Sequence, residues 1–108
     1  MIRYGELDQA LSVYTRNDER EKIPMGYYRR VIKLAIEINN KGKQWDMQQS
    51  AAILLYLAFS DGHLQPSQLT SSGLNALDYA EMLLQDTGIG IEQAVETTRA
   101  PVRSIGKK

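Results

Sequence analysis

His63 is the only histidine of the chain, and it follows Asp61 and Gly62 directly. An aspartate that orients a histidine, with a serine as the nucleophile, is the arrangement of a hydrolase triad. Ser60 and Ser67 are close in sequence, but the sequence lacks the Gly-x-Ser-x-Gly turn that presents a nucleophilic serine. We therefore interpret His63 as a polar residue of an exposed loop, and we expect the chain not to be an enzyme.

The sequence indicates no metal or cofactor site. The chain has no cysteine, one histidine and scattered acids, so the usual ligand sets for zinc and other transition metals are missing. Gly88-Ile89-Gly90 lacks the third glycine and the preceding strand of a dinucleotide-binding loop. We expect no cofactor, no bound metal and no small-molecule substrate.

Two adjacent tyrosines, Tyr27 and Tyr28, precede Arg29 and Arg30. Aromatic and basic side chains together can bind nucleic acid, by stacking on bases and pairing with phosphates. The same order is also typical of core aromatics at the start of a helix, followed by solvated charges. Tyr27 lies at helical spacing from Val31, which favours burial of Tyr27.

The overall composition is that of a globular protein of one domain. The chain has 108 residues, of which 43% are hydrophobic and 24% charged, with zero net charge. The uncharged stretch over residues 47–60 is shorter than the roughly 20 residues that a transmembrane helix needs. The first residues lack the order of a secretory signal. We expect a cytoplasmic protein without membrane contact, with a domain over 1–100 and a basic, flexible tail over 101–108.

Charges of opposite sign are separated along the chain. Residues 1–45 contain nine Lys or Arg and six Asp or Glu, whereas residues 46–96 contain seven acids and no Lys or Arg. The two blocks could pack beside each other within one bundle. Alternatively, they could form a bipolar surface on which the acidic face of one copy meets the basic face of another, or on which a partner protein binds.

Apolar residues recur at helical spacing along most of the chain, which predicts an all-α, compact bundle of four to five helices. The expected helices cover about 6–16, 26–40, 46–59, 73–87 and 91–99. The third helix is expected at the centre because it carries no charge over 47–60, and Asp46 with Gln49 fits a capping box at its start. The fourth helix is expected to bury one stripe of side chains: Leu74, Leu77, Ala80 and Leu84.

The helix expected over 26–40 is apolar over more than half of its circumference, so it should be buried on more than one side. In a domain this small, that pattern indicates either a central helix or a subunit contact. We predict a contact with a protein partner, or with a second copy in a homodimer, through these residues: Tyr28, Arg29, Arg30, Ile32, Lys33 and Ile36. The predicted acidic face consists of Asp78, Glu81 and Asp86.

Residues 51–89 contain, in order, an apolar helix, the turn Asp61-Gly62, the segment Leu64-x-Pro66-x-x-Leu69 and the helix start Gly73-Leu74. This order resembles the helix-turn-helix core of winged-helix regulators. The resemblance implies a short helix that opens with proline, a turn that contains glycine, and a recognition helix that binds DNA.

Two features of the sequence differ from that pattern. The spacing between Leu69 and Gly73 is shorter than the resemblance implies. The helix in the recognition position carries Asp78 and Glu81 and no base, although DNA binding depends on Lys and Arg that neutralise phosphates. We therefore expect a small, non-catalytic interaction or regulatory protein. A DNA-binding transcriptional regulator with a degenerate helix-turn-helix is the alternative.

Overall fold

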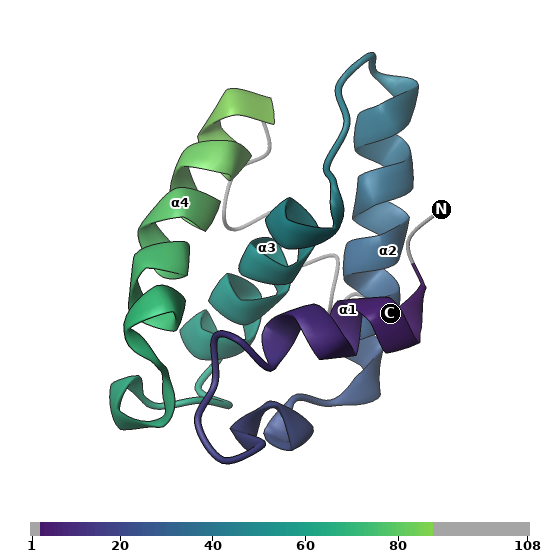
Figure 1. Cartoon of the computed structure of the whole chain (residues 1–108). Coiled ribbons are helices and arrows are strands. Elements are labelled where there is room, and N and C mark those ends of the chain that lie inside the picture. Colours follow the sequence, from purple (N-terminus) through teal and green to yellow (C-terminus); the bar gives the residue numbers. More distant parts are fainter. Residues whose placement is uncertain (1–2, 88–108) are drawn as a thin grey trace, which may run out of the picture.

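Four α-helices form the computed structural model, which describes residues 3–87 (Figure 1). The helices are α1 (Tyr4–Leu11), α2 (Met25–Asn40), α3 (Met47–Ser60) and α4 (Ser71–Thr87). Two short 3-10 helices, η1 (Glu19–Lys22) and η2 (Pro66–Gln68), lie in the connections. Over residues 3–87 the only β-type pairing is an isolated bridge between Thr15 and Leu69. The predicted all-α fold is confirmed.

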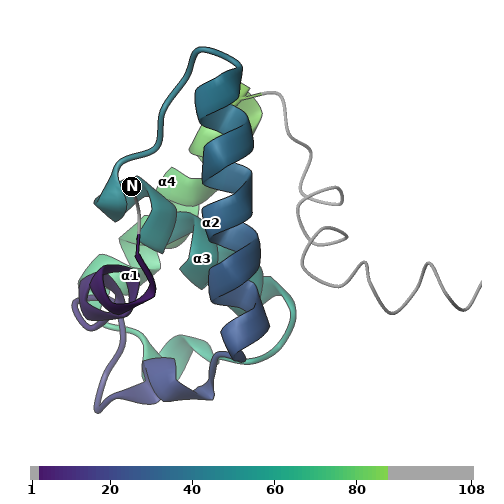
Figure 2. The same cartoon turned by 90° about the vertical axis from the view of Figure 1, so that its right-hand side faces the viewer.

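Helix α3 is the centre of the bundle, as its uncharged sequence predicted. The other three helices all pack against it, and α2 and α4 lie on opposite sides of it (Figures 1 and 2). All side chains from Ser50 to Leu55 are buried. Because no residue of α3 is charged, the helix can be surrounded without the cost of burying an unpaired charge.

The predicted capping box at the start of α3 is confirmed. Asp46 Oδ1 accepts a hydrogen bond from the Gln49 amide at 2.8 Å, and Gln49 Oε1 accepts one from the Asp46 amide at 2.9 Å. These two bonds satisfy amides that a helix start otherwise leaves free. At the other end of the connection to α2, Gly42 has φ 89°, the left-handed conformation that favours glycine after a helix.

Helix α1 is shorter than predicted, because it ends at Leu11 and not near Arg16. The residues that follow pair with the chain ahead of α4: Thr15 bridges to Leu69, and the Arg16 amide donates to the Gln68 carbonyl oxygen at 2.8 Å. Asn17 and Asp18, which come next, have left-handed backbone conformations with φ 48° and 60°. A pairing between distant segments therefore ends the helix, and local spacing does not show it.

The start of α4 packs against the backbone that follows α1. A Cβ atom at Gly73 would lie 2.1 Å from the Tyr14 carbonyl oxygen, so only glycine permits this approach. Thr70 joins the same contact: its amide donates to the Tyr14 carbonyl at 2.9 Å, and its hydroxyl donates to the Val13 carbonyl at 2.7 Å. With Gly73 facing inward, Leu74 is 45% exposed, so its predicted burial was wrong.

The rest of the predicted α4 stripe faces the core. Ala80 and Leu84 are buried, and Leu77 is partly buried against the core cluster. Three predictions fall outside the described residues: the helix over 91–99, the basic tail over 101–108 and the upper limit of the predicted domain.

The segment between α3 and α4 departs from the helix-turn-helix pattern. The middle element is η2, a 3-10 helix of three residues. Gly73 is the third residue of α4 and does not lie in a turn before it. Thr70 directly caps α4, because its hydroxyl oxygen accepts a hydrogen bond from the Gly73 amide at 3.0 Å. The short helix implied by the resemblance is therefore only a 3-10 turn that begins at Pro66, and the implied glycine turn before α4 is not formed.

Candidate functional site

His63 and Asp61 are brought together by Tyr27 of α2. The Tyr27 hydroxyl donates a hydrogen bond to Asp61 Oδ2. His63 Nε2 lies 3.1 Å from the same hydroxyl oxygen, and the two rings meet edge to face with centroids 5.0 Å apart. His63 is therefore half-buried and bonded to a core tyrosine, which corrects the expectation of an exposed loop residue.

This cluster links two parts of the fold, and its hydrogen bonds are not those of a triad. A triad needs a serine hydroxyl bonded to the histidine and an acid on the other ring nitrogen. Within residues 3–87, His63 has no hydrogen bond to a serine, and both His63 and Asp61 bind the Tyr27 hydroxyl. The cluster joins α2 to the turn after α3, 34 and 36 residues further along the chain.

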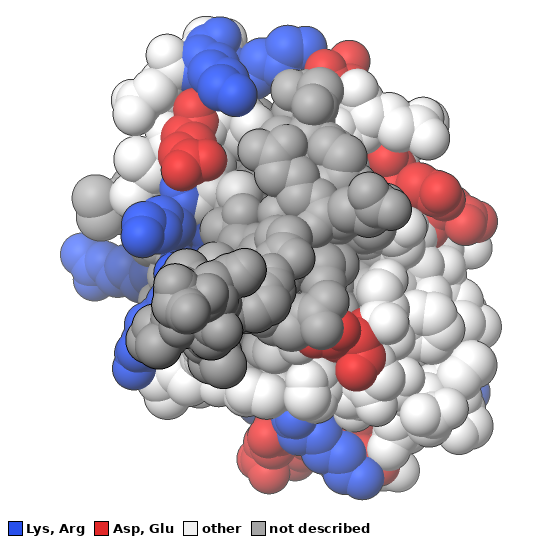
Figure 3. All heavy atoms as spheres, turned by 180° about the vertical axis from the view of Figure 1, so that it is seen from behind, with Lys and Arg blue, Asp and Glu red and all other residues white. Residues whose placement is uncertain are grey.

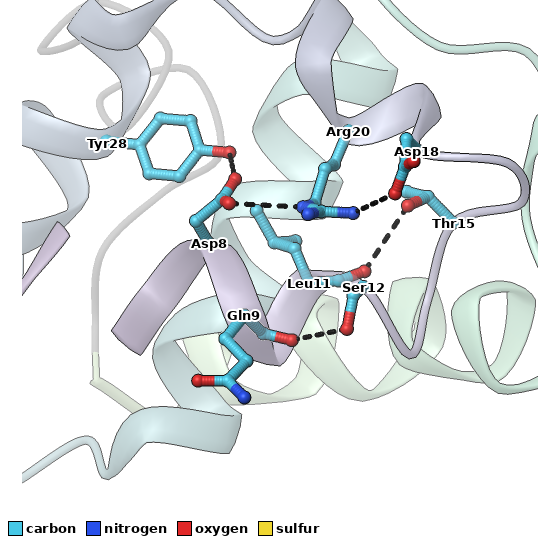
Figure 4. A network of polar contacts seen from close by, with 8 residues as sticks. All are labelled: Asp8, Gln9, Leu11, Ser12, Thr15, Asp18, Arg20 and Tyr28. Carbon is cyan, nitrogen blue, oxygen red and sulfur yellow. Dashed lines mark hydrogen bonds and ion pairs between the residues drawn. The ribbon is translucent and has the colours of Figure 1, made fainter. Parts of the chain in front are cut away.

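A second polar network surrounds Tyr28 (Figure 4). The Tyr28 hydroxyl donates to Asp8 Oδ1 at 2.8 Å, and Arg20 Nη1 donates to Asp18 Oδ1 at 2.7 Å. Arg20 Nε lies 3.2 Å from Asp8 Oδ2, an ion pair in which the N–H is not aimed well enough at the oxygen for a hydrogen bond. Burial and the Asp8 carboxylate raise the pKa of Tyr28 well above its ordinary range.

Tyr28 is therefore part of the core. It is 2% exposed, and it also packs against Tyr4 with ring centroids 4.5 Å apart. Its inclusion among the predicted partner-binding residues was wrong, because a side chain buried within its own chain cannot reach a partner. The sequence did not show that Tyr28 is buried while its neighbours on α2 are exposed, because apolar residues occur on both the buried and the exposed sides of this helix.

The other predicted contact residues lie on the solvent side of α2, except Ile32, which packs in part against the core cluster. Arg29, Lys33 and Ile36 are exposed, and Arg30 and Ile32 are partly exposed. Met25, which sequence reasoning did not include, is 50% exposed and precedes Arg29 by one helical turn. We call the following residues the α2 outer face: Met25, Arg29, Arg30, Ile32, Lys33 and Ile36.

Helix α4 carries the opposite charge on its exposed side. The predicted acidic residues Asp78, Glu81 and Asp86 are all exposed. Exposed apolar side chains lie between them, and sequence reasoning placed none of these on a contact surface. We call the following residues the α4 outer face: Leu74, Asp78, Tyr79, Glu81, Met82 and Asp86.

Most charged residues of the two outer faces have no ion pair with another described residue. Over the described part of the chain, Asp86 has an ion pair with Lys43 at 3.2 Å, whereas Asp78 and Glu81 have none. The bases of the α2 outer face likewise have no ion pair there. Seen from behind, Lys and Arg side chains gather along the left-hand edge, the side on which α2 lies (Figure 3).

The described residues contain neither a membrane-spanning helix nor a cluster of metal ligands. No helix among residues 3–87 is both long enough and apolar enough to cross a membrane. In the same range, no three His, Asp or Glu side chains are grouped so that they could hold a metal ion.

Comparisons with known proteins give no relative from which a function could be carried over. No family model, no curated protein and no solved structure matches the chain. The two outer faces and the two tyrosine networks are therefore the features from which a function can be argued.

Proposed function

We propose that this chain is a small, non-catalytic interaction protein that self-associates through the α2 outer face, with a homodimer as the smallest assembly. The observation that carries the proposal is the composition of that face. Met25 and Ile36 are 50% and 46% exposed on a helix whose other apolar side chains are mostly in the core. Burial of such side chains favours association because it removes apolar surface from water.

The charges of the α2 outer face support a contact with a protein. Arg29, Arg30 and Lys33 lie on α2 between the exposed apolar residues Met25 and Ile36, so charged and apolar side chains share one face, as they do in protein interfaces. Charges in this position orient the partner and speed the encounter more than they raise affinity. The proposed location is the cytoplasm. The chain has no cysteine, so its fold does not depend on the oxidising environment in which disulfides form.

The proposal predicts that Ile36→Glu disrupts self-association. The substitution places a charge on one of the two exposed apolar side chains of the contact, and the exposed position should tolerate it in the folded chain. The measurement is sedimentation equilibrium over a concentration series. The matched control is Val13→Glu, which adds the same charge at a side chain that is 54% exposed and outside both outer faces. Equal association constants for wild type and Ile36→Glu would contradict the proposal.

DNA binding is the second candidate, and the cluster of Arg29, Arg30 and Lys33 is the observation that favours it. Bases that no acid neutralises can bind phosphates. The acidic outer face of α4 and the absence of a helix-turn-helix in the described residues argue against readout by α4. This candidate predicts salt-sensitive binding to duplex DNA that is lost in the double variant Arg29→Gln/Arg30→Gln. A mobility shift assay at low salt without any shift would remove it.

A further inference from the structure

We infer that the surface contacted by the α2 outer face is the α4 outer face of a second copy of this chain. The inference rests on the proposed function, since it names the partner of the same surface. The inference goes beyond the proposed function because it predicts a head-to-tail contact between two different faces.

The two faces are complementary in charge. The α2 outer face presents Arg29, Arg30 and Lys33, whereas the whole of α4 contains three acids and no base. Asp78 and Glu81 are the acids that no described Lys or Arg neutralises. Bringing these two faces together pairs charges that have no ion pair among residues 3–87, which is the complementarity that orients protein complexes.

The two faces also present exposed apolar side chains in similar patterns. Of the seven large apolar side chains exposed among the described residues, two lie on the α2 outer face and three on the α4 outer face. Met82, at 60%, is the most exposed of them and follows Asp78 by one helical turn. Each face thus mixes charged and apolar residues over about three turns of helix, which suits a helix-to-helix contact.

A contact of α2 with α2 is disfavoured by the same charges. A two-fold contact presents each residue of the patch to the same patch on the other copy. Arg29, Arg30 and Lys33 of one copy would then face the same three bases of its partner, and Glu37 beside them is the only acid on α2. A contact of α4 with α4 would likewise bring acids against acids.

The positions of α2 and α4 determine the kind of assembly. Because the two helices lie on opposite sides of α3 (Figures 1 and 2), one copy cannot use both faces on the same partner copy. A dimer formed in this way leaves one α2 outer face and one α4 outer face free. Such a heterologous contact continues into chains or closes into rings, so the dimer is the first member of a series that grows with concentration.

The test uses two charge-reversed variants and their mixture. The basic face is reversed in Arg29→Glu/Lys33→Glu, and the acidic face in Asp78→Lys/Glu81→Lys. Each is studied by sedimentation velocity over a concentration series, alone and mixed in equal amounts. The matched control for the acidic-face variant, Glu6→Lys/Glu21→Lys, makes the same change in net charge at two exposed acids outside both faces. Circular dichroism shows whether each variant retains the helix content of wild type.

We expect each reversed variant alone to self-associate about a hundredfold more weakly than wild type, because like charges replace opposite ones at the contact. The mixture should recover association, since the unaltered acidic face of one variant can bind the unaltered basic face of the other. The control should associate as wild type does. If the acidic-face variant loses helix content, the milder Asp78→Asn/Glu81→Gln replaces it, and we expect a smaller loss of self-association.

Two results would overturn the inference and are distinct from failure of the proposed function. The first is wild-type association of the acidic-face variant combined with loss of association in the basic-face variant; α2 would then contact something other than α4. The second is a mixture that associates no better than its components. A wild-type chain that stays monomeric at every concentration, by contrast, would contradict the proposed function itself.

Discussion

At the scale of single residues, two adjacent tyrosines of α2 are each bonded to an acid from another part of the chain. The Tyr27 hydroxyl donates to Asp61 and the Tyr28 hydroxyl to Asp8. These bonds fix the rotation of α2 about its axis. They therefore also fix which residues of α2 face solvent, including Ile36.

Replacement of Tyr28 by phenylalanine is expected to lower the free energy of unfolding by about 1.5 kcal/mol, because it removes a buried hydrogen bond to a carboxylate. Urea denaturation followed by circular dichroism measures the change. Tyr79→Phe is the matched control: its exposed hydroxyl accepts one hydrogen bond, from Gln49 at 3.2 Å, and we expect a change within about 0.5 kcal/mol. A loss in Tyr28→Phe no larger than in the control would show that the Asp8 bond contributes little.

The same tyrosine predicts how stability depends on pH. Burial and Asp8 raise the pKa of Tyr28 in the folded chain above its ordinary value of 10.0, so the folded chain holds this proton more tightly than the unfolded chain does. This contribution is fully present below pH 10.0 and is lost as the pH rises above it. The stability difference between wild type and Tyr28→Phe should therefore stay constant from about pH 8 to about pH 10 and shrink between about pH 10 and about pH 11. Urea denaturation at each pH checks this; a constant difference would contradict it.

At the scale of elements, the contact between Gly73 of α4 and the backbone at Tyr14 makes the strongest prediction. Gly73→Ala would place a Cβ atom 2.1 Å from the Tyr14 carbonyl oxygen. The start of α4 must then move, and we expect a loss of about 3 kcal/mol in the free energy of unfolding. Gly5→Ala is the matched control in α1: a Cβ there has nothing within 4 Å, and alanine should stabilise the helix by about 0.5 kcal/mol. Equal effects of the two substitutions on the urea midpoint would contradict the tight contact.

The elements that the sequence predicted well depend on neighbours along the chain. The limits of α2 and α3 and the capping box of Asp46 with Gln49 all follow from residues within one or two helical turns. The errors came from pairings between distant segments. The early end of α1 depends on Leu69, and the half-burial of His63 depends on Tyr27, 36 residues away.

At the scale of the whole molecule, counting charges along the sequence predicted two surfaces of opposite sign but not their positions. The acids of α4 and the bases of α2 could have lain side by side. Because α3 is uncharged and lies between them (Figure 1), the two faces point away from each other and cannot neutralise each other within one chain. The burial of Tyr28 and the exposure of Leu74 could not be predicted, since each depends on how a helix is rotated in the packed bundle.

Light scattering of the wild-type chain on a sizing column shows directly whether this chain associates with copies of itself, as proposed for the α2 outer face. The chain has a mass of 12.2 kDa. At high micromolar concentration and low salt we expect a mass above that of one chain. In high salt the mass should fall, as screening weakens the charged rim, but stay above one chain because apolar burial persists. A mass of 12.2 kDa at both salt concentrations would contradict the account.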